Sequence, residues 1–242
     1  MRISNFMPRL VSLCLTLGML MAPSALAQEQ EQEQEQEQEQ TAAAVLKKTT
    51  DKVLTVIDDA KEYVKSDPDR YYQRVNEVLD EVVDFRGFAR GVMGDYASSE
   101  RYRALDEAGR EKLRQQLDRF TEAMRDGLVR TYSKGLLAFG GSRVELDRER
   151  SKFSDEGNPD RATLRQLIYS DGSEPYVVTY QMAKNRDGKW LMRNLIVENV
   201  NLGQIYRSQF EASARKFDGD LDKVIADWEV EPIEDIKAET TA

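Results

Sequence analysis

The chain has 242 residues, a formal net charge of −9 at pH 7, no histidine and one cysteine, Cys14. This acidic balance, without a basic stripe, argues against nucleic-acid binding and against firm attachment to anionic lipid surfaces. The lack of histidine excludes Ser-His-Asp and Cys-His catalytic groups and histidine-based zinc sites, so no catalytic residue or metal site of these kinds is expected. No cofactor is expected either, because the sequence contains no phosphate-binding glycine loop or dinucleotide motif.

The first 27 residues have the pattern of an export signal. Positive charge precedes an apolar run over 10–21, and a small-x-small cleavage site ends at Ala27. The apolar run has about a dozen residues, fewer than the roughly 20 that a membrane-spanning helix needs. We therefore expect cleavage near Ala27, loss of Cys14 with the signal, and a soluble mature protein that begins at Gln28.

The rest of the chain divides into three segments by composition. Residues 28–41 are mostly alternating Gln and Glu, a tract with little apolar surface to bury, and we expect a disordered, solubilising leader. Residues 42–229 are numerous enough to form one domain with a sizeable core. Residues 230–242 form an acidic tail. The sequence therefore predicts a single domain between two polar ends.

Apolar residues recur at three- and four-residue spacing through the first half of this domain, which is typical of amphipathic helices. Asp67, Asp84 and Asn201 stand where a side chain can cap a helix N-terminus, and Gly140-Gly141 ends the longest apolar stripe. The predicted helices cover 42–66, 68–83, 84–96, 106–139, about 202–217 and about 221–228.

After Gly141 the apolar period changes to two-residue alternation, which predicts strands near 143–149, 161–170, 174–184 and 189–198. Turn-forming residues between the last three favour an antiparallel meander. In the last strand we expect Trp190, Met192 and Ile196 to face one side of the sheet. The predicted fold class is α+β, with helices packed on a curved antiparallel sheet of about four strands that encloses an apolar pocket.

One acidic segment has spacing similar to that of a calcium-binding loop. Asp218, Asp220 and Asp222 hold positions one, three and five, and Glu229 holds position twelve. Lys223, however, occupies the sixth position, where the loop needs glycine for a sharp turn. We therefore expect a helix capped by Asp218 or Asp220, and no metal site.

Three functions stay open at the level of the residues. Asp84 and Tyr132 could act as the proton-transfer pair of an isomerase-like enzyme on a cone-shaped α+β fold, although a helix cap and a stripe position explain these two residues better, because nothing in the sequence places them together. A ligand-free adaptor is the second alternative. Binding of an apolar ligand in the pocket is the interpretation that the surplus of apolar surface favours.

Four segments, in order, carry a family resemblance. Residues 82–96 (VVDFRGFARGVMGDY) match the pattern D-F-x-x-[MF]-A-x-x-V-L-G-x-Y, and residues 120–136 match the helix F-x-x-x-L-x-x-x-Y-x-x-x-L. Residues 188–202 match a G-x-W strand with its following turn, and residues 206–210 (YRSQF) match Y-R-x-Q-F. The chain thus resembles the MlaC family of periplasmic phospholipid-binding proteins, also called toluene-tolerance auxiliary proteins. Asn199 replaces the family's usual glycine, and asparagine tolerates a positive φ.

The resemblance implies a soluble periplasmic carrier without enzymatic activity, whose ligand is a phospholipid. Its partners would be an outer-membrane lipoprotein complex and an inner-membrane ABC transporter complex with its substrate-binding component, and its role would be to maintain outer-membrane lipid asymmetry. The expected lipid contacts are Val92, Tyr96, Leu128, Tyr132, Leu136, Tyr180, Ile196 and Val197.

Overall fold

The computed structural model of the chain describes residues 41–154, 157–169 and 174–232. The predicted export signal with its cleavage site, the leader up to residue 40 and the tail from residue 233 lie outside the described residues. All described residues belong to one compact unit of the chain, which begins at Gln38. No helix among them is long and apolar enough to cross a membrane.

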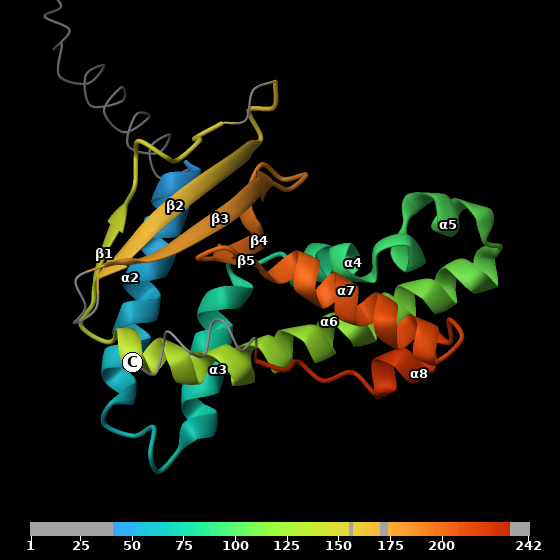
Figure 1. The fold of residues 1–242 in the computed structure, drawn as a ribbon, viewed down its shortest axis with the longest axis horizontal. Coiled ribbons are helices and arrows are strands. Elements are labelled where there is room, and N and C mark those ends of the chain that lie inside the picture. Colours follow the sequence, from blue (N-terminus) through green and yellow to red (C-terminus); the bar gives the residue numbers. More distant parts are fainter. Residues whose placement is uncertain (1–40, 155–156, 170–173, 233–242) are drawn as a thin grey trace, which may run out of the picture. The chain divides into compact units, whose positions relative to one another are not determined.

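Seven α-helices form in the described parts of the chain, and most begin at a capping side chain. Asp84 accepts a hydrogen bond from the backbone N–H of Gly87 (2.9 Å), and Asn201 accepts one from Gln204 (3.2 Å). Such caps satisfy backbone donors that the first helical turn leaves unpaired. The helices are α2 (Ala42–Ala60), α3 (Pro68–Asp80), α4 (Phe85–Met93), α5 (Ser99–Ala104), α6 (Glu107–Leu136), α7 (Leu202–Lys216) and α8 (Leu221–Ala226) (Figure 1).

The predicted helices are confirmed, but most of them end earlier than the apolar stripes suggest, α2 and α4 among them. α2 ends at Ala60, and 61–66 continue as turns. α4 ends at Met93, because Gly94 takes a φ of 55°, a left-handed value that stops the helix, and a short 3₁₀-helix follows as η1 (Gly94–Ala97). An apolar side chain in a turn can continue a helical stripe, so the stripe alone overestimates helix length.

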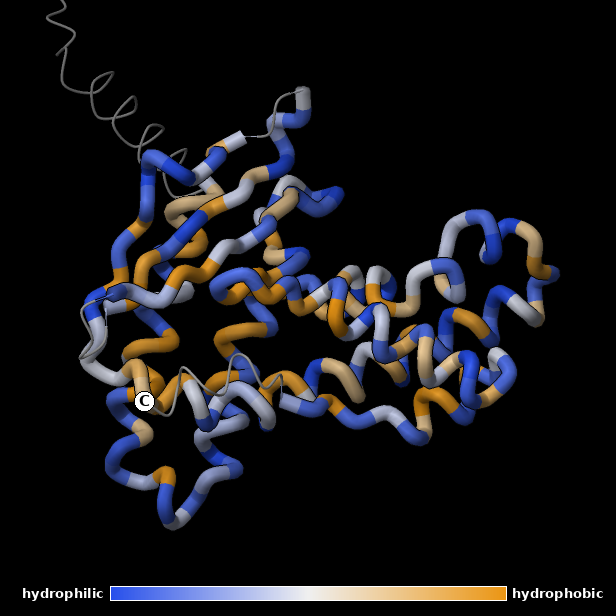
Figure 2. Tube along the Cα trace, in the orientation of Figure 1, coloured by the Kyte–Doolittle hydropathy of each residue, from blue (hydrophilic) through white to orange (hydrophobic). Residues whose placement is uncertain are grey.

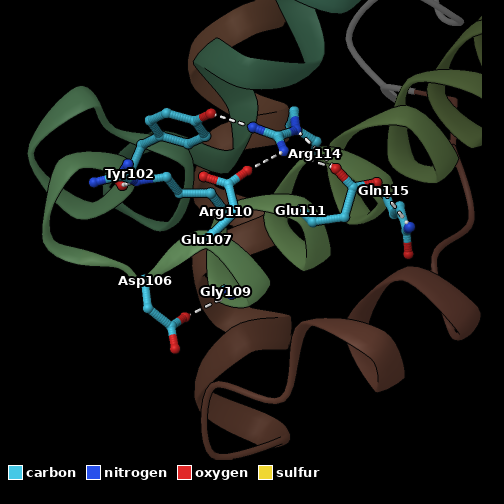
Figure 3. Close-up of polar contacts among 8 residues, drawn as sticks. All are labelled: Tyr102, Asp106, Glu107, Gly109, Arg110, Glu111, Arg114 and Gln115. Carbon is cyan, nitrogen blue, oxygen red and sulfur yellow. Dashed lines mark hydrogen bonds and ion pairs between the residues drawn. The ribbon is translucent and has the colours of Figure 1, made fainter.

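The apolar pattern does not predict α5, which polar contacts attach to the start of α6 (Figure 3). The Arg114 guanidinium donates to the carboxylates of Glu111 (2.7 Å) and Glu107 (3.1 Å) and to the Tyr102 hydroxyl. Arg110 donates to the Tyr102 carbonyl oxygen (3.1 Å). The bonds to Glu111 and Glu107 raise the pKa of Arg114 above its usual value. Because polar groups make this attachment, hydrophobic periodicity gives no sign of it.

Five strands form one antiparallel sheet in the order β1-β2-β3-β4-β5. They are β1 (Arg143–Leu146), β2 (Arg161–Tyr169), β3 (Tyr176–Lys184), β4 (Trp190–Val197) and β5 (Val200–Asn201). The four predicted strands are confirmed, and β5 is an additional pair of residues that returns along the end of β4. Leu46 of α2 packs with Leu164 of β2 and Met182 of β3, so α2 covers one face of the sheet. The predicted α+β class is confirmed.

A bulge in β4 changes the side-chain alternation of that strand. Gln181 pairs with Asn194, whereas the next residue, Met182, pairs with Met192. Arg193 is therefore an extra residue in β4 that has no partner on β3. An extra residue of this kind reverses the faces on which the following side chains lie.

The bulge corrects one prediction about β4. Trp190 and Met192 lie on the face that α2 covers, and after the bulge Leu195 and Val197 continue that face, since Leu195 pairs with Tyr180. Ile196 lies on the opposite face. The prediction that Ile196 shares a face with Trp190 and Met192 is wrong, because uninterrupted alternation does not hold across an inserted residue.

The turn between β4 and β5 keeps the positive φ that the family's glycine would supply, but at a different residue. Within the described ranges the non-glycine residues with positive φ are Glu198 (52°) and Asp218 (50°), so the conformation expected at Asn199 belongs to Glu198. The Glu198 carboxylate accepts a hydrogen bond from the backbone N–H of Val177 (2.5 Å). This bond to β3 stabilises a backbone conformation that is unfavourable for a residue with a Cβ atom.

The largest buried cluster packs α4, α7 and α8 against the first half of α6, which runs on toward the sheet (Figure 1). The Phe120 ring, fully buried, lies 4.9 Å from the Phe210 ring and 5.1 Å from the Trp228 ring between centroids. Two smaller clusters join α2 to the sheet, and α2 and α3 to the second half of α6. Apolar and polar residues alternate along α6 in both halves (Figure 2).

Candidate functional site: an apolar cavity

A cavity of about 1180 Å³ lies between the sheet, α2 and the second half of α6. The sheet supplies the face that carries Val178, Tyr180, Leu195 and Val197, because strand pairing places these side chains on one side. The bulge at Arg193 is what brings Leu195 and Val197 onto this wall. The sheet thus presents a continuous apolar surface to the cavity.

The helices supply the opposite walls. Leu128, Tyr132 and Leu136 of α6 recur every four residues and all line the cavity, together with Val53 and Ile57 of α2. Leu128, Tyr132 and Leu136 are only half-buried, although they point inward. Apolar side chains in close-packed protein interiors contact neighbours on every side. One side of each of these three side chains instead faces the cavity, so part of their apolar surface makes no contact with other protein atoms.

Polar groups in the cavity wall are mostly hydrogen-bonded within the protein. The Gln166 amide on β2 donates to the Thr50 hydroxyl on α2 (2.9 Å), which also bonds to the carbonyl oxygen of Leu46 (2.9 Å). The Asn194 amide donates to the Asn201 side chain (2.9 Å). Buried polar groups without partners would cost stability, and these pairs also fix the spacing of α2, β2 and β4. They support the cavity more than they offer chemistry to a ligand.

Two tyrosines in the wall differ in their hydroxyl contacts. The Tyr180 hydroxyl has no hydrogen-bond partner among the described residues, and its burial raises the phenol pKa above the usual value. The Tyr132 hydroxyl bonds to the Tyr206 hydroxyl (2.7 Å), which also bonds to the Glu231 carbonyl oxygen (3.2 Å). Burial, followed by the bond to Tyr132, raises the pKa of Tyr206. Burial among apolar side chains therefore favours the neutral phenol of Tyr180 and of Tyr206.

The segment after α8 also contributes to the cavity. The carbonyl oxygen of Val230 accepts a hydrogen bond from the Thr131 hydroxyl (3.0 Å), and the Val230 side chain lies against Gly127 of α6. Pro232 lines the cavity. We call residues 229–232 the strap, because they lie along α6 beside the cavity.

Exposed residues mark where the cavity meets solvent. Most lining residues are buried or half-buried, and the exposed ones gather on α6, η2 (Leu137–Phe139), the β4–β5 turn and the strap. We call these five residues the rim: Arg130, Lys134, Ala138, Asn199 and Pro232.

The structure places five of the eight predicted contact residues in the cavity lining: Leu128, Tyr132, Leu136, Tyr180 and Val197. The other three lie elsewhere. Val92 is 1% exposed within the cluster of α4, α6 and α7, and the Tyr96 ring packs 5.8 Å from the Phe210 ring in that same cluster. Ile196 lies on the outer face of the sheet because of the bulge. These three residues are therefore not part of the candidate site.

Several lining residues escape the sequence prediction. α2 contributes Thr49, Val53 and Leu54, and the ends of two other elements contribute Phe139 and Tyr176. The helical stripe of α2 shows that Val53 faces inward. It does not show whether Val53 meets another side chain or an open space, and this is why the residue is not recognisable as part of a site.

The two residues considered for proton transfer have structural contacts. The Asp84 carboxylate caps α4 through Gly87 and forms an ion pair with Arg193 of the β4 bulge. The Tyr132 hydroxyl bonds to Tyr206. The cap and stripe roles are therefore confirmed, and Asp84 also fastens α4 to the sheet.

The acidic segment after α7 caps and anchors a helix. Asp220 accepts hydrogen bonds from the backbone N–H groups of Asp222 and Lys223 at the start of α8. Asp222 forms ion pairs with Lys112 and Arg119 of α6, and the hydrogen bond from Arg119 contributes most to lowering its pKa to about 2. No group of His, Cys, Asp and Glu that could hold a metal occurs in the described ranges. Asp220 is thus the cap, one of the two residues that the sequence allowed.

Fold and site together define a class of protein: an α+β domain in which one sheet face and two helices enclose a large apolar cavity. Comparison with known proteins places the chain more closely. A family model described as "MlaC protein" matches residues 47–230. The chain therefore belongs to the MlaC family, as the resemblance of its sequence motifs predicts.

Two similar proteins agree with this family. The toluene tolerance protein ttg2D of Pseudomonas putida is 29% identical over 184 residues, which cover 76% of this chain and 78% of that protein. A phospholipid-binding protein from Ralstonia solanacearum, solved in complex with a phospholipid, has a TM-score of 0.61 at 20% identity. The alignment covers 77% of this chain and 97% of the Ralstonia chain, so the two share a fold.

Proposed function

We propose that the protein binds one phospholipid molecule whose acyl chains lie in the cavity. The observation that carries this proposal is the cavity of about 1180 Å³, which exceeds the roughly 300–1,000 Å³ typical of pockets for drug-sized ligands. The fold shared with a protein solved in complex with a phospholipid supports the same ligand class. The lipid contacts that we propose are Leu128, Tyr132, Leu136, Tyr180 and Val197.

The energetics suit a carrier more than an enzyme. Burying an acyl chain gains about 0.8 kcal/mol per CH₂ group, so two chains compensate for the cost of leaving a bilayer. An apolar wall whose polar groups are already hydrogen-bonded can supply this binding energy without any reactive group. The isomerase-like alternative has no comparable support, because Asp84 is engaged as a helix cap and Tyr132 in a tyrosine pair. A ligand-free adaptor would not account for the large apolar cavity.

We further propose that the protein is soluble in the periplasm and shuttles lipid between an outer-membrane lipoprotein complex and an inner-membrane ABC transporter complex, maintaining outer-membrane lipid asymmetry. Family membership and the export-signal pattern of residues 1–27 support this role. A carrier that passes lipid between two membranes must hide the acyl chains from water during transit, and the enclosed cavity is suited to that task.

Native mass spectrometry of protein isolated gently from the periplasm tests lipid binding. We expect a stoichiometric diacyl lipid in the as-isolated protein and its exchange for labelled lipid from vesicles. Protein that is isolated without lipid, and that takes up none from vesicles, would contradict the proposal. Transfer of labelled lipid from one reconstituted partner complex to the other, only in the presence of the protein, tests the shuttle role.

A further inference from the structure

The rim of the cavity carries two positive side chains, although the protein as a whole is acidic. Arg130 and Lys134 lie four residues apart on α6, and both are exposed and line the cavity. Residues with this spacing have Cβ atoms about 5–6 Å apart on one helix face. The chain as a whole has a formal charge of −9, so two adjacent cations at the opening stand against the overall balance.

The charges of these two residues are weakly compensated. The Lys134 side chain forms no ion pair or hydrogen bond within the described ranges. Arg130 lies 3.5 Å from a carboxylate oxygen of Asp69, and its guanidinium carbon lies 5.8 Å from the centre of the Tyr72 ring. Exposed ion pairs of this length stabilise a protein by little. The Lys134 ammonium is therefore available to an anionic partner, and Arg130 can exchange its weak partner Asp69 for a stronger one.

The other charged residues of the lining are already engaged. Arg193 is paired with Asp84. Glu198, the one acidic residue that lines the cavity in the described chain, accepts the hydrogen bond from the Val177 N–H that holds the β4–β5 turn. Among the lining residues, a ligand cation would thus meet two positive side chains and one carboxylate that already accepts a backbone hydrogen bond.

We propose that Arg130 and Lys134 bind the phosphodiester of the lipid head group and select lipids with net negative head groups over those that carry an ammonium group. This inference rests on the proposed lipid binding and adds the chemical class of the ligand. Arg and Lys are the residues that bind phosphate oxygens most readily. In a zwitterionic lipid the ammonium group offsets the phosphate charge and is repelled by the same two cations.

A competition experiment tests this preference. Lipid-free protein is incubated with vesicles that contain equal amounts of phosphatidylglycerol and phosphatidylethanolamine with identical acyl chains, and the bound lipids are measured by native mass spectrometry. We expect about fivefold enrichment of phosphatidylglycerol, the effect of two exposed charges of modest strength. In the Arg130→Gln/Lys134→Gln variant we expect a ratio near one.

A matched variant separates the local effect from the change in net charge. Lys48→Gln/Arg103→Gln removes the same two positive charges from exposed positions outside the cavity lining and should keep the preference of the unmodified protein. An equal ratio in the unmodified protein, or a preference that survives in Arg130→Gln/Lys134→Gln, would overturn the inference. Absence of bound lipid in every protein would instead refute the proposed function.

Inorganic phosphate distinguishes a lipid head group from free phosphate as the source of the anion. Lipid-free protein is titrated with millimolar phosphate while the NMR signals of Arg130 and Lys134 are followed. We expect no saturable shift, because a head group is held at the rim mainly by the acyl chains that anchor it. If phosphate binds saturably and the ratio of bound phosphatidylglycerol to phosphatidylethanolamine is one, Arg130 and Lys134 form a site for free phosphate. This result would overturn the inference.

Discussion

The two halves of α6 carry the same kind of apolar stripe and use it in opposite ways. In the first half, Phe120 and Met124 are fully buried against α4, α7 and α8. In the second half, Leu128, Tyr132 and Leu136 continue the stripe at the same spacing but stay half-buried beside the cavity. The difference lies in the elements that face the stripe. The packed helices α4, α7 and α8 face its first half, whereas the sheet and α2 face its second half across the cavity.

This comparison shows what an amphipathic stripe does and does not encode. The stripe records which side of a helix faces inward, and it does so equally well for both halves. Whether the facing elements fill the space depends on the summed volumes and positions of side chains from many segments. A packed core and a binding cavity can therefore share one continuous pattern on one helix.

Truncation in the two halves should give the largest contrast. Phe120→Ala should lower the free energy of unfolding of lipid-free protein by about 3–5 kcal/mol, because it opens a void in close-packed surroundings. Leu136→Ala should cost less than about 2 kcal/mol, since this side chain already borders empty space. Urea denaturation measures both values. Equal costs would refute the distinction, and Phe120→Leu provides a milder variant if Phe120→Ala does not fold.

A substitution at Gly127, where the two halves of α6 meet, tests the contact between α6 and the strap, because it adds a single methyl group there. A Cβ atom at Gly127 would overlap the Val230 side chain, so Gly127→Ala should destabilise the protein by about 1–3 kcal/mol even though alanine favours helices. Gly91→Ala is the control, because a Cβ there meets nothing within 4 Å and should be neutral or stabilising. Thermal unfolding of both variants, with hydrogen exchange at residues 229–231, gives the result. A stabilising Gly127→Ala would show that the strap does not press on α6.

A large side chain introduced into β4 should fill part of the cavity at Val197 but not at the neighbouring Ile196. Val197→Trp should exclude at least two CH₂ groups of ligand at about 0.8 kcal/mol each, which lowers lipid affinity roughly tenfold. Ile196→Trp places the same ring on the opposite face of the sheet and should leave lipid affinity unchanged. Lipid bound per protein at limiting vesicle concentration is the measurement. Equal loss in both variants would mean that the bulge does not separate the two faces in solution.

The smallest effect concerns an ion pair of the packed half and depends on pH. Asp222 has a pKa of about 2, below the usual 3.8, so its charged form stabilises the fold above about pH 4, and this contribution disappears as the pH falls toward 2. Asp222→Asn should therefore lower stability by less than about 1 kcal/mol near neutral pH, because the group is partly exposed. The difference from the unmodified protein should shrink as the pH falls through 2 and vanish below it. A difference that does not change with pH would argue against the ion pairs as its cause.

Much of the fold could be predicted from local signals. Capping residues such as Asp84 and Asn201 act through bonds to backbone groups three residues away, and the change of apolar period after Gly141 separates helices from strands without any tertiary information. α5 could not be predicted in this way, because Arg110 and Arg114 attach it by polar contacts.

The candidate site could be predicted only in part. Leu128, Tyr132 and Leu136 follow from one stripe, but Val92 has the same apolar character and is an ordinary core residue. Ile196 could not be assigned either, because nothing in the sequence reveals that Arg193 is an inserted residue of β4. Both errors arise because cavity walls depend on register and on volumes contributed by distant segments.

The length of α6 has a mechanical consequence. Its 30 residues, at about 1.5 Å each, make a rod of roughly 45 Å that is clamped along its first half by α4, α7 and α8. The second half also packs against α2 and α3, so the helix that forms this wall of the cavity is supported along its whole length. We therefore expect any change in cavity width on ligand binding to come from movement of the sheet and α2 relative to α6.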